Sequence, residues 1–369
     1  MTSLHSVLAA TILVSTAAWA QSPWIIRHAG SPPLNGVAAS DRLVIAVGDS
    51  GTLLSSPNGE TWKLESVPTS QASLTSVGFG GGIWVASTSD GTLLKSTDGA
   101  QWFKNGQPLP RRVTAFAFNT GMFVAISDGS PWYSADGENW TRVAEINRVS
   151  PGILAVGGGR FLAAQLNFSA GSILESTDGI HWAEHPRPAE IIYSIGYGGD
   201  RYLVIGIHSG TGVGTRSFSS TDLTNWTPGG ALSGLRPGAL AFSEGIHVAA
   251  GGGPPEMSVD GSAWSPGGAT GPGVIRAMVP FAGHFIAVNF DGSIRQSPDL
   301  LSASMAHPGV VRISGPGGGR YEIRAQDALQ PGTSWPRVGE VNLQSVPLDW
   351  TDPEADAHTD RWYRVEGPF

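Results

Sequence analysis

The chain has 369 residues, a formal net charge of −8 and no cysteine. The length leaves room for one large domain and one small one. The missing cysteine excludes disulfides, thiolate metal sites and a cysteine nucleophile, and the negative charge argues against nucleic acid as the main partner. Glycine makes up 51 residues, about twice the usual share of about 7%, which is typical of an all-β chain with many tight turns.

Residues 1–20 are expected to be a signal peptide. The short apolar run Val7–Val14 is followed by Ala18-Trp-Ala20, which fits the small-x-small rule for cleavage. A retained membrane anchor is the alternative, because few positive charges precede the run, but the run is short for a membrane span. We therefore expect an exported protein, secreted or periplasmic, with no transmembrane span in the mature chain.

A seven-fold repeat dominates the next part of the chain. The pattern Ser-x-Asp-Gly-x-x-Trp, intact or degraded, returns with successive serines 38 to 44 residues apart. The seven copies begin at Ser56, Ser96, Ser134, Ser176, Ser220, Ser258 and Ser297. A fixed period of about 40 residues with short strands is typical of the blades of a β-propeller.

Each copy of the repeat is expected to form a tight turn. The acidic side chain accepts bonds from the amides ahead of it, Gly adopts a positive φ, and the serine hydroxyl satisfies a further amide. The Trp opens the next strand, packs on a neighbouring blade and needs one partner for its N–H. The structural residues predicted at the third position are Asn58, Asp98, Asp136, Asp178, Asp222, Asp260 and Asp299.

The repeat resembles the bacterial neuraminidase repeat, or Asp-box, of β-propeller proteins, in a form one residue shorter than usual. The resemblance covers about residues 22–303 and implies a seven-bladed propeller. It also implies that the boxes are structural and lie away from the active face, so the resemblance brings no activity with it.

Four strand-like pieces make up each repeat. In the second repeat these are residues 74–79, 83–87, 92–96 and 101–104. The second piece is apolar almost throughout, as in Phe123–Ile126, which is expected of a strand that is buried on both faces. The sequence thus predicts an all-β fold in which residues 21–303 form seven four-stranded blades.

The ring is expected to close through the N-terminal segment. The seventh copy lacks its Trp, whereas Trp24 lies 38 residues before Trp62, one full period. We expect Trp24–Arg27 to form the outer strand of the seventh blade, beside the strand that holds Ile294. Such closure removes exposed sheet edges, which promote aggregation.

Residues 304–369 lie outside the period and are expected to form a small β-sandwich-like module. Strand-like pieces include Val310–Ile313 and Tyr321–Arg324. The ending, Asp352 followed by Arg361–Val365, resembles the fibronectin-III-like tail modules of secreted bacterial proteins.

Two segments superficially match ligand-binding motifs. His181-Trp-Ala-Glu-His185 fits a zinc-protease pattern, but that chemistry needs both histidines on one face of a helix, and this segment is a predicted strand. Gly210–Gly214 suggests a phosphate loop, but no helix follows it, so an ordinary loop is expected. No metal and no cofactor is predicted.

A carbohydrate-active enzyme is the first alternative function. A sialidase would need three arginines, a Tyr–Glu pair and an aspartic acid, but the nearest candidates, Arg27 and Tyr321-Glu322, fall on the closing strand and in the tail module. Asp90, Asp128 and Asp291 could supply a glycosidase's two carboxylates, but each precedes Gly in a predicted tight turn. No catalytic residue is therefore assigned.

The predicted binding site is a group of arginines at the channel mouth. The loops that enter the innermost strands of five consecutive blades each carry arginine, at Arg111, Arg112, Arg148, Arg187, Arg236 and Arg276. Such a ring would attract a carboxylate or sulfate, unless the arginines are ordinary surface residues or already pair with carboxylates. The sequence thus predicts a non-catalytic binding or scaffold propeller for an acidic glycan or an acidic protein. A second alternative is an assembly factor for a membrane complex, a role implied by the resemblance to some shortened-box relatives.

Overall fold

The structure is a computed structural model. It describes residues 12–14, 23–30, 32–69, 71–144, 152–164, 172–208, 214–233, 237–243, 245–267, 273–298, 302–307, 310–314, 320–326, 336–342, 348–354 and 362–366. The chain divides into two compact units. One comprises Pro23–Ser297, and the other comprises Met1–Ser22 together with Pro298–Phe369.

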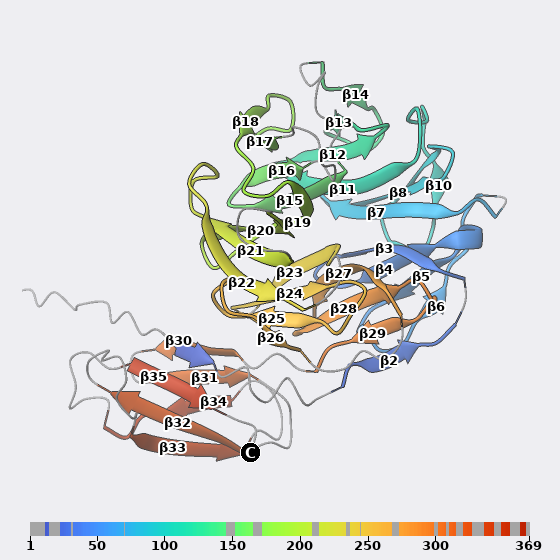
Figure 1. The fold of residues 1–369 in the computed structure, drawn as a ribbon. Helices are drawn as coiled ribbons and strands as arrows, with labels where there is room; N and C mark the ends of the chain where they lie inside the picture. The colour runs from blue at the N-terminus through green and yellow to red at the C-terminus, as the bar shows by residue number, and fades with distance from the viewer. Residues whose placement is uncertain are drawn as a thin grey trace, which may run out of the picture. The chain divides into compact units, whose positions relative to one another are not determined.

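The described residues of the larger unit form seven four-stranded antiparallel sheets, which we call blades 1 to 7 (Figure 1). Blade 1 consists of β3 (Leu34–Ala39), β4 (Val44–Gly48), β5 (Leu53–Ser56) and β6 (Lys63–Leu64). Blade 2 consists of β7 (Leu74–Gly80), β8 (Ile83–Thr88), β9 (Leu93–Ser96) and β10 (Phe103–Lys104). Blade 3 consists of β11 (Val113–Asn119), β12 (Met122–Ser127), β13 (Ser130–Ser134) and β14 (Thr141–Arg142). Blade 4 consists of β15 (Ile153–Gly157), β16 (Arg160–Ala164), β17 (Ile173–Ser176) and β18 (Ala183–His185). Blade 5 consists of β19 (Ile191–Gly198), β20 (Arg201–Ile207), β21 (Thr215–Ser220) and β22 (Thr227–Leu232). Blade 6 consists of β23 (Ala239–Ser243), β24 (Ile246–Ala250), β25 (Glu256–Ser258) and β26 (Ser265–Pro266). Blade 7 consists of β27 (Ile275–Phe281), β28 (His284–Asn289), β29 (Ile294–Gln296) and β2 (Ile25–His28).

The blades close into a ring around a central axis. The first strand of each blade contacts the first strand of the next, and β27 contacts β3, so the innermost strands form a closed circle (Figure 1). The second strands are almost fully buried, as in β12 and β28, because blades pack against both of their faces. The all-β, seven-bladed propeller predicted from the repeat is confirmed.

The N-terminal segment supplies the outer strand of blade 7. Strand β2 pairs antiparallel with β29, with Ile25 opposite Gln296 and Ile26 opposite Arg295. Trp24 is 5% exposed, and its indole N–H donates to the carbonyl of Gly267 at 3.1 Å. This pairing is the one expected from the spacing of Trp24 and Trp62, and it joins segments more than 240 residues apart in the chain.

The repeated turn has one geometry in its successive copies. In the second copy, the Ser96 hydroxyl donates to Asp98 at 3.0 Å, and Asp98 accepts from the amides of Ala100 and Gln101. The Trp102 indole N–H donates to the carbonyl of Gly99 at 2.9 Å, so each turn partners its own tryptophan. These bonds favour the ionised carboxylate and lower the pKa of Asp98.

The fifth copy shows which part of the turn is essential. It carries Leu223 where other copies have Gly, yet the hydrogen bonds of Ser220 and Asp222 are retained. Leu223 has a φ of 64°, a left-handed conformation that is costly for a side chain with a Cβ. Its side chain is 1% exposed and packs in the core of blades 4 and 5, and this burial offsets the strain.

Glycines at the ends of innermost strands allow neighbouring blades to approach closely. A Cβ on Gly80 would lie 1.9 Å from the ring of Phe118, and one on Gly198 would lie 2.1 Å from the ring of Phe242. The aromatic ring of the following blade thus lies directly on the glycine backbone. The glycine-rich composition therefore serves packing between blades as well as turns.

The smaller unit contains two sheets. One has β30 (Ser302–His307), β31 (Val310–Ser314) and β34 (Leu348–Thr351), and the other has β1 (Ile12–Val14), β35 (Trp362–Glu366), β32 (Arg320–Gln326) and β33 (Arg337–Asn342). Residues of both sheets share a small core, which includes Val311, Ile323 and Tyr363. The Tyr363 hydroxyl donates to Asp352 at 2.7 Å.

Strand β1 belongs to the predicted signal peptide and pairs in parallel with β35. In this structure the segment is part of the tail sheet, and its removal on export stays a prediction. The described part of the chain contains no helix with the length and apolar character of a membrane span.

Candidate functional site: the mouth of the central channel

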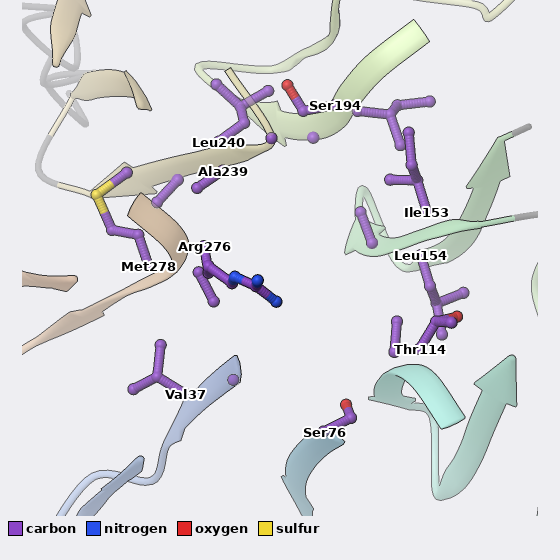
Figure 2. Close-up of a pocket in the computed structure, with 18 of the residues that line it drawn as sticks. Val37, Ser76, Thr114, Ile153, Leu154, Ser194, Ala239, Leu240, Arg276 and Met278 are labelled. Atoms are coloured by element: carbon purple, nitrogen blue, oxygen red, sulfur yellow. The ribbon is translucent and has the colours of Figure 1, made fainter. Parts of the chain in front are cut away.

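A cavity of about 590 Å³ lies on the propeller axis. Residues of all seven innermost strands line it, and Figure 2 shows their side chains converging from around the ring. A cavity of this size can hold a ligand of drug-like dimensions. The cavity is therefore the candidate functional site.

β-Bulges determine which side chains face this cavity. Five innermost strands carry one extra residue in their pairing with the second strand, between Leu34 and Gly36 in blade 1 and at the equivalent place in blades 2, 3, 5 and 7. The extra residues all line the cavity, and they are Asn35, Thr75, Thr114, Tyr193 and Arg276. A bulge redirects a side chain that regular pairing would place elsewhere. We call these five residues the bulge ring.

Hydrogen bonds link the bulge ring from blade to blade. Arg276 of blade 7 donates through Nη1 to Oδ1 of Asn35 in blade 1 at 3.2 Å. The Asn35 amide donates in turn to the carbonyl of Leu74 in blade 2 at 3.0 Å and to Asp49 at 2.9 Å. The Thr75 hydroxyl donates to the carbonyl of Val113 in blade 3 at 2.9 Å. The mouth is thus preorganised by the same contacts that hold four neighbouring blades together.

Arg276 is the principal charge in the cavity wall. Figure 2 shows its side chain reaching into the cavity from β27. The guanidinium carbon lies 4.6 Å from the centre of the Phe290 ring, a cation–π contact that fixes the plane of the group. Within the described ranges, no carboxylate forms an ion pair with Arg276. Its charge is therefore held in place but not neutralised.

Blades 4 and 6 give the cavity a different wall. Their innermost strands pair regularly, and Gly152 and Gly238 occupy the positions that correspond to the bulge ring. The wall there is formed by aliphatic side chains, among them Leu154 and Leu240, which Figure 2 places around the cavity. The site is thus cationic at blade 7 and apolar at blades 4 and 6, with Tyr193 and Ser194 of blade 5 between those two.

His247 also borders the cavity, but as a packing residue. It is 2% exposed, and its ring centre lies 4.6 Å from that of Phe242. Burial, with a smaller contribution from the charge of Arg201, lowers the pKa of His247 to about 4. It is therefore neutral at pH 7 and adds no charge to the site.

The six predicted arginines do not share one environment in the structure. Arg276 lies in the cavity wall. Arg111 forms an ion pair with Asp128 at 3.0 Å, Arg187 donates to the carbonyl of Glu190 at 3.0 Å, and Arg112 is exposed; none of these three is among the residues that line the cavity. Arg148 and Arg236 lie outside the described residues. The binding role of the group as a whole stays a prediction.

The aspartates considered as glycosidase carboxylates make local bonds. Asp90 accepts from the Thr88 hydroxyl and the Thr92 amide, which lower its pKa. Burial opposes ionisation of Asp291, but bonds from the hydroxyl and amide of Ser293 outweigh it, so the pKa is lowered here too. Among the described residues that line the cavity there is no Asp or Glu.

The other motif-like residues also have separate partners. His181 contacts Asp178 at 2.8 Å, whereas His185 contacts Glu175 at 2.7 Å, so the two histidines do not converge. Across the described segments, no group of three His, Asp or Glu side chains could hold a metal ion. Arg27 pairs with Glu60, and Glu322 pairs with Arg324 and Arg337. Most of Gly210–Gly214, the side chain of Tyr321 and the predicted turn residue Asp299 lie outside the described residues.

The fold and the axial cavity define a seven-bladed β-propeller with a ligand-sized channel. No family model matches the chain, and no curated relative matches it. It is similar in structure to Ycf48 bound to D1 peptide, with a TM-score of 0.60, 20% identity, and coverage of 75% of this chain and 97% of that one. Ycf48 from Cyanidioschyzon merolae gives a TM-score of 0.58 at 16% identity, over 75% of this chain and 98% of that one.

A second group of similar structures consists of lyases. Catalytically inactive virginiamycin B lyase from Staphylococcus aureus with quinupristin gives a TM-score of 0.63 at 11% identity, over 74% of this chain and 97% of that one. At such identities these likenesses show a shared propeller fold and leave function to be argued from the site.

Proposed function

We propose that this chain is an exported, non-catalytic binding protein whose channel mouth holds an anionic group of its partner. The observation that carries the proposal is Arg276, which reaches into the axial cavity and has no ion-pair partner within the described residues. Arg276 is exposed to solvent, so salt screens its attraction for an anion, but its guanidinium can still meet a carboxylate through charge-assisted hydrogen bonds. Asn35 and Phe290 hold the group in place, so little ordering is left for the ligand to impose.

A segment of a protein is the partner class that we propose by analogy with one of the similar structures, and Arg276 is the reason to expect that the segment is acidic. A propeller of similar fold, Ycf48, has been solved bound to D1 peptide, so a propeller of this architecture is compatible with a peptide ligand. An assembly factor that holds a segment of a membrane complex is one form of this proposal. The apolar segment Val7–Val14, as part of a signal peptide, supports export.

A lyase or glycosidase function has weaker support from the residues at the site. The solved lyase with quinupristin is inactive as a histidine-to-alanine variant, whereas the histidine that borders the cavity here, His247, is buried against Phe242. A glycosidase needs two carboxylates about 5 to 10 Å apart, and the described cavity wall offers none. Binding without chemistry is the function that these residues fit best.

The experiment uses a labelled peptide of alternating Glu and Ser and its twin with Gln in place of Glu, measured by fluorescence anisotropy. The wild-type chain is expected to bind the Glu peptide more tightly than the Gln peptide, and more weakly as salt rises. Arg276→Gln should weaken binding of the Glu peptide about tenfold or more.

The matched control is Arg112→Gln, which removes the same charge from an exposed arginine outside the cavity wall. Equal losses in the two variants would mean that only net charge matters and would refute the site. A further outcome is that heparin displaces the Glu peptide while Arg112→Gln and Arg276→Gln weaken peptide binding equally. That result would favour an acidic glycan bound on the outer surface instead.

A further inference from the structure

The two unlike walls of the cavity restrict the anion further, provided that the proposed function holds. We propose that Arg276 binds a carboxylate carried directly on an apolar stem, and that the stem lies along the aliphatic wall of blades 4 and 6. The same chemistry is offered by the last residue of a polypeptide with an apolar side chain and by a free apolar carboxylic acid.

The number of charges favours a single negative charge. Arg276 is the one charged side chain at pH 7 in the described cavity wall, because His247 is buried and neutral. A phosphate monoester carries close to two negative charges at pH 7 and three acceptor oxygens, so one guanidinium would leave it partly unneutralised. One guanidinium matches one carboxylate.

The orientation of Arg276 favours a planar partner. One terminal nitrogen is engaged by Asn35, and the face of the group lies against Phe290. A carboxylate can meet the remaining edge of the fork in the plane of the guanidinium with two parallel hydrogen bonds. A lysine at this place would offer neither the plane nor the stacking.

Three hydroxyl groups of the cavity wall are already engaged, which makes the site less suited to a sugar. Thr75 and Thr114 donate to main-chain carbonyls of Val113 and Ile126, and Ser194 donates to the carbonyl of Pro237. Their donors are therefore already used within the protein. These three donors are not available to a glycan, which needs many hydrogen bonds along its length, and the other hydroxyl side chains of the described wall are those of Ser76, Tyr193 and Tyr197; an apolar stem needs none.

The glycines leave room for the stem. A Cβ on Gly238 would meet no atom within 4 Å, so the position that a bulge residue fills in blade 7 is open in blade 6. Leu240 follows on the same strand, and Figure 2 shows it beside the cavity together with Ala239 and Met278. Burying an apolar stem against such a wall stabilises a complex in proportion to the area covered.

The probe is 4-phenylbutyrate, titrated calorimetrically into the wild-type chain. Its primary amide, which has no charge, and acetate, which has no apolar stem, should each bind about tenfold or more weakly. Phenyl phosphate should also bind more weakly than 4-phenylbutyrate. Equal binding of acetate and 4-phenylbutyrate, or tighter binding of phenyl phosphate, would overturn the inference.

Two variants separate this inference from the proposed function. Gly238→Leu places a side chain at a position where a Cβ would meet no atom within 4 Å, and it should weaken 4-phenylbutyrate about tenfold while leaving the melting temperature and the binding of the Glu peptide nearly unchanged. Arg276→Gln should weaken both ligands. If Arg276→Gln leaves the Glu peptide unaffected, the proposed function fails; if it weakens that peptide but Gly238→Leu leaves 4-phenylbutyrate unaffected, only the apolar stem is refuted.

A last comparison distinguishes the two sources of the carboxylate. A peptide that ends in Leu with a free carboxylate and the same peptide with an amidated end are titrated beside 4-phenylbutyrate. If a chain end is the natural ligand, the peptide with the free carboxylate should bind more tightly than 4-phenylbutyrate, and the amidated peptide should lose this extra affinity. A free acid as the ligand predicts the reverse order.

Discussion

His247 gives the propeller a stability that depends on pH. It lies at the place in β24 that Trp84, Phe123 and Phe285 occupy in other blades, and like them it is almost completely buried. Its folded-state pKa is lowered from 6.5 to about 4, by burial first and by Arg201 second, against an opposing effect of Asp260. Below pH 6.5 the unfolded chain therefore binds a proton that the folded chain refuses, and stability falls as the pH falls.

The size of this effect follows from the two pKa values. With 6.5 for the unfolded state and about 4 for the folded state, the free energy of unfolding should decrease by roughly 2 kcal/mol from pH 7 to pH 5 and by about 3 kcal/mol by pH 4. The substitution His247→Phe restores the aromatic residue of the other blades and removes this proton. At pH 7 it should change stability by less than about 1.5 kcal/mol, as a core exchange of similar shape.

The assay is urea unfolding of the wild-type chain and of His247→Phe at pH 7, 6 and 5, followed by tryptophan fluorescence. The other eight histidines titrate in both proteins and cancel in the difference between them. The variant should gain roughly 2 kcal/mol relative to wild type between pH 7 and pH 5. A difference between the two proteins that is the same at all three pH values would refute the argument that His247 is buried in its neutral form.

Four further predictions concern the scaffold. Asp136→Ala should lower the free energy of unfolding by about 1 to 3 kcal/mol, because two turn amides lose their acceptor; loss of peptide binding with normal unfolding would contradict this structural role. Asn58→Asp should raise the melting temperature at pH 7, because the equivalent aspartates have a lowered pKa in the folded state. This gain in stability should be present above about pH 4 and be lost as the pH falls further, so a gain that persists in acid would show that the carboxylate charge is not its source. Trp24→Ala should cost about 3 to 5 kcal/mol, since this buried side chain joins the closing strand to Gly267; an unchanged urea midpoint would mean that the closure contributes little. Gly80→Ala should destabilise the propeller, because the new Cβ would collide with Phe118. Gly82 has open space around it and a positive φ, so Gly82→Ala should cost only about 1 kcal/mol of stability. Equal losses of stability in the two variants would argue against close packing at Gly80.

The fold was predictable because its determinants are local and repeated. Each Ser-x-Asp-Gly-x-x-Trp segment contains its own donors and acceptors, and the structure shows the bonds closing within seven residues, as between Ser96 and Trp102. The closing strand could be located for the same reason, since Trp24 falls one period before Trp62. Leu223 shows the limit of such rules: it breaks the turn pattern, but burial of its side chain keeps the turn.

The site was less predictable because it depends on register and on side-chain direction. Arg111 and Arg187 were expected at the mouth from their loops, but whether a loop arginine meets a ligand or a neighbour depends on contacts such as Arg111 with Asp128, which loop position does not specify. Thr75 and Thr114 were missed altogether, because a bulge arises from how two strands pair and not from the residue that it displaces. The available signal was weak: a polar residue following the first apolar residue of an innermost strand.

The repeat itself explains where chemistry can arise in this propeller. Positions that every blade must share, such as the turn aspartate and the buried second strand, are committed to holding the blade together. The position of the bulge ring lies at the axis, and in five blades it is released from strand pairing, so its side chain can differ from blade to blade, although Asn35 and Thr75 also link neighbouring blades. Around the ring, starting at blade 1, it holds Asn35, Thr75, Thr114, Gly152, Tyr193, Gly238 and Arg276. One charged side chain, two glycines, three small polar side chains and one tyrosine make an asymmetric site out of a nearly symmetric scaffold, and the single arginine among them is the basis of the anion-binding role that we propose.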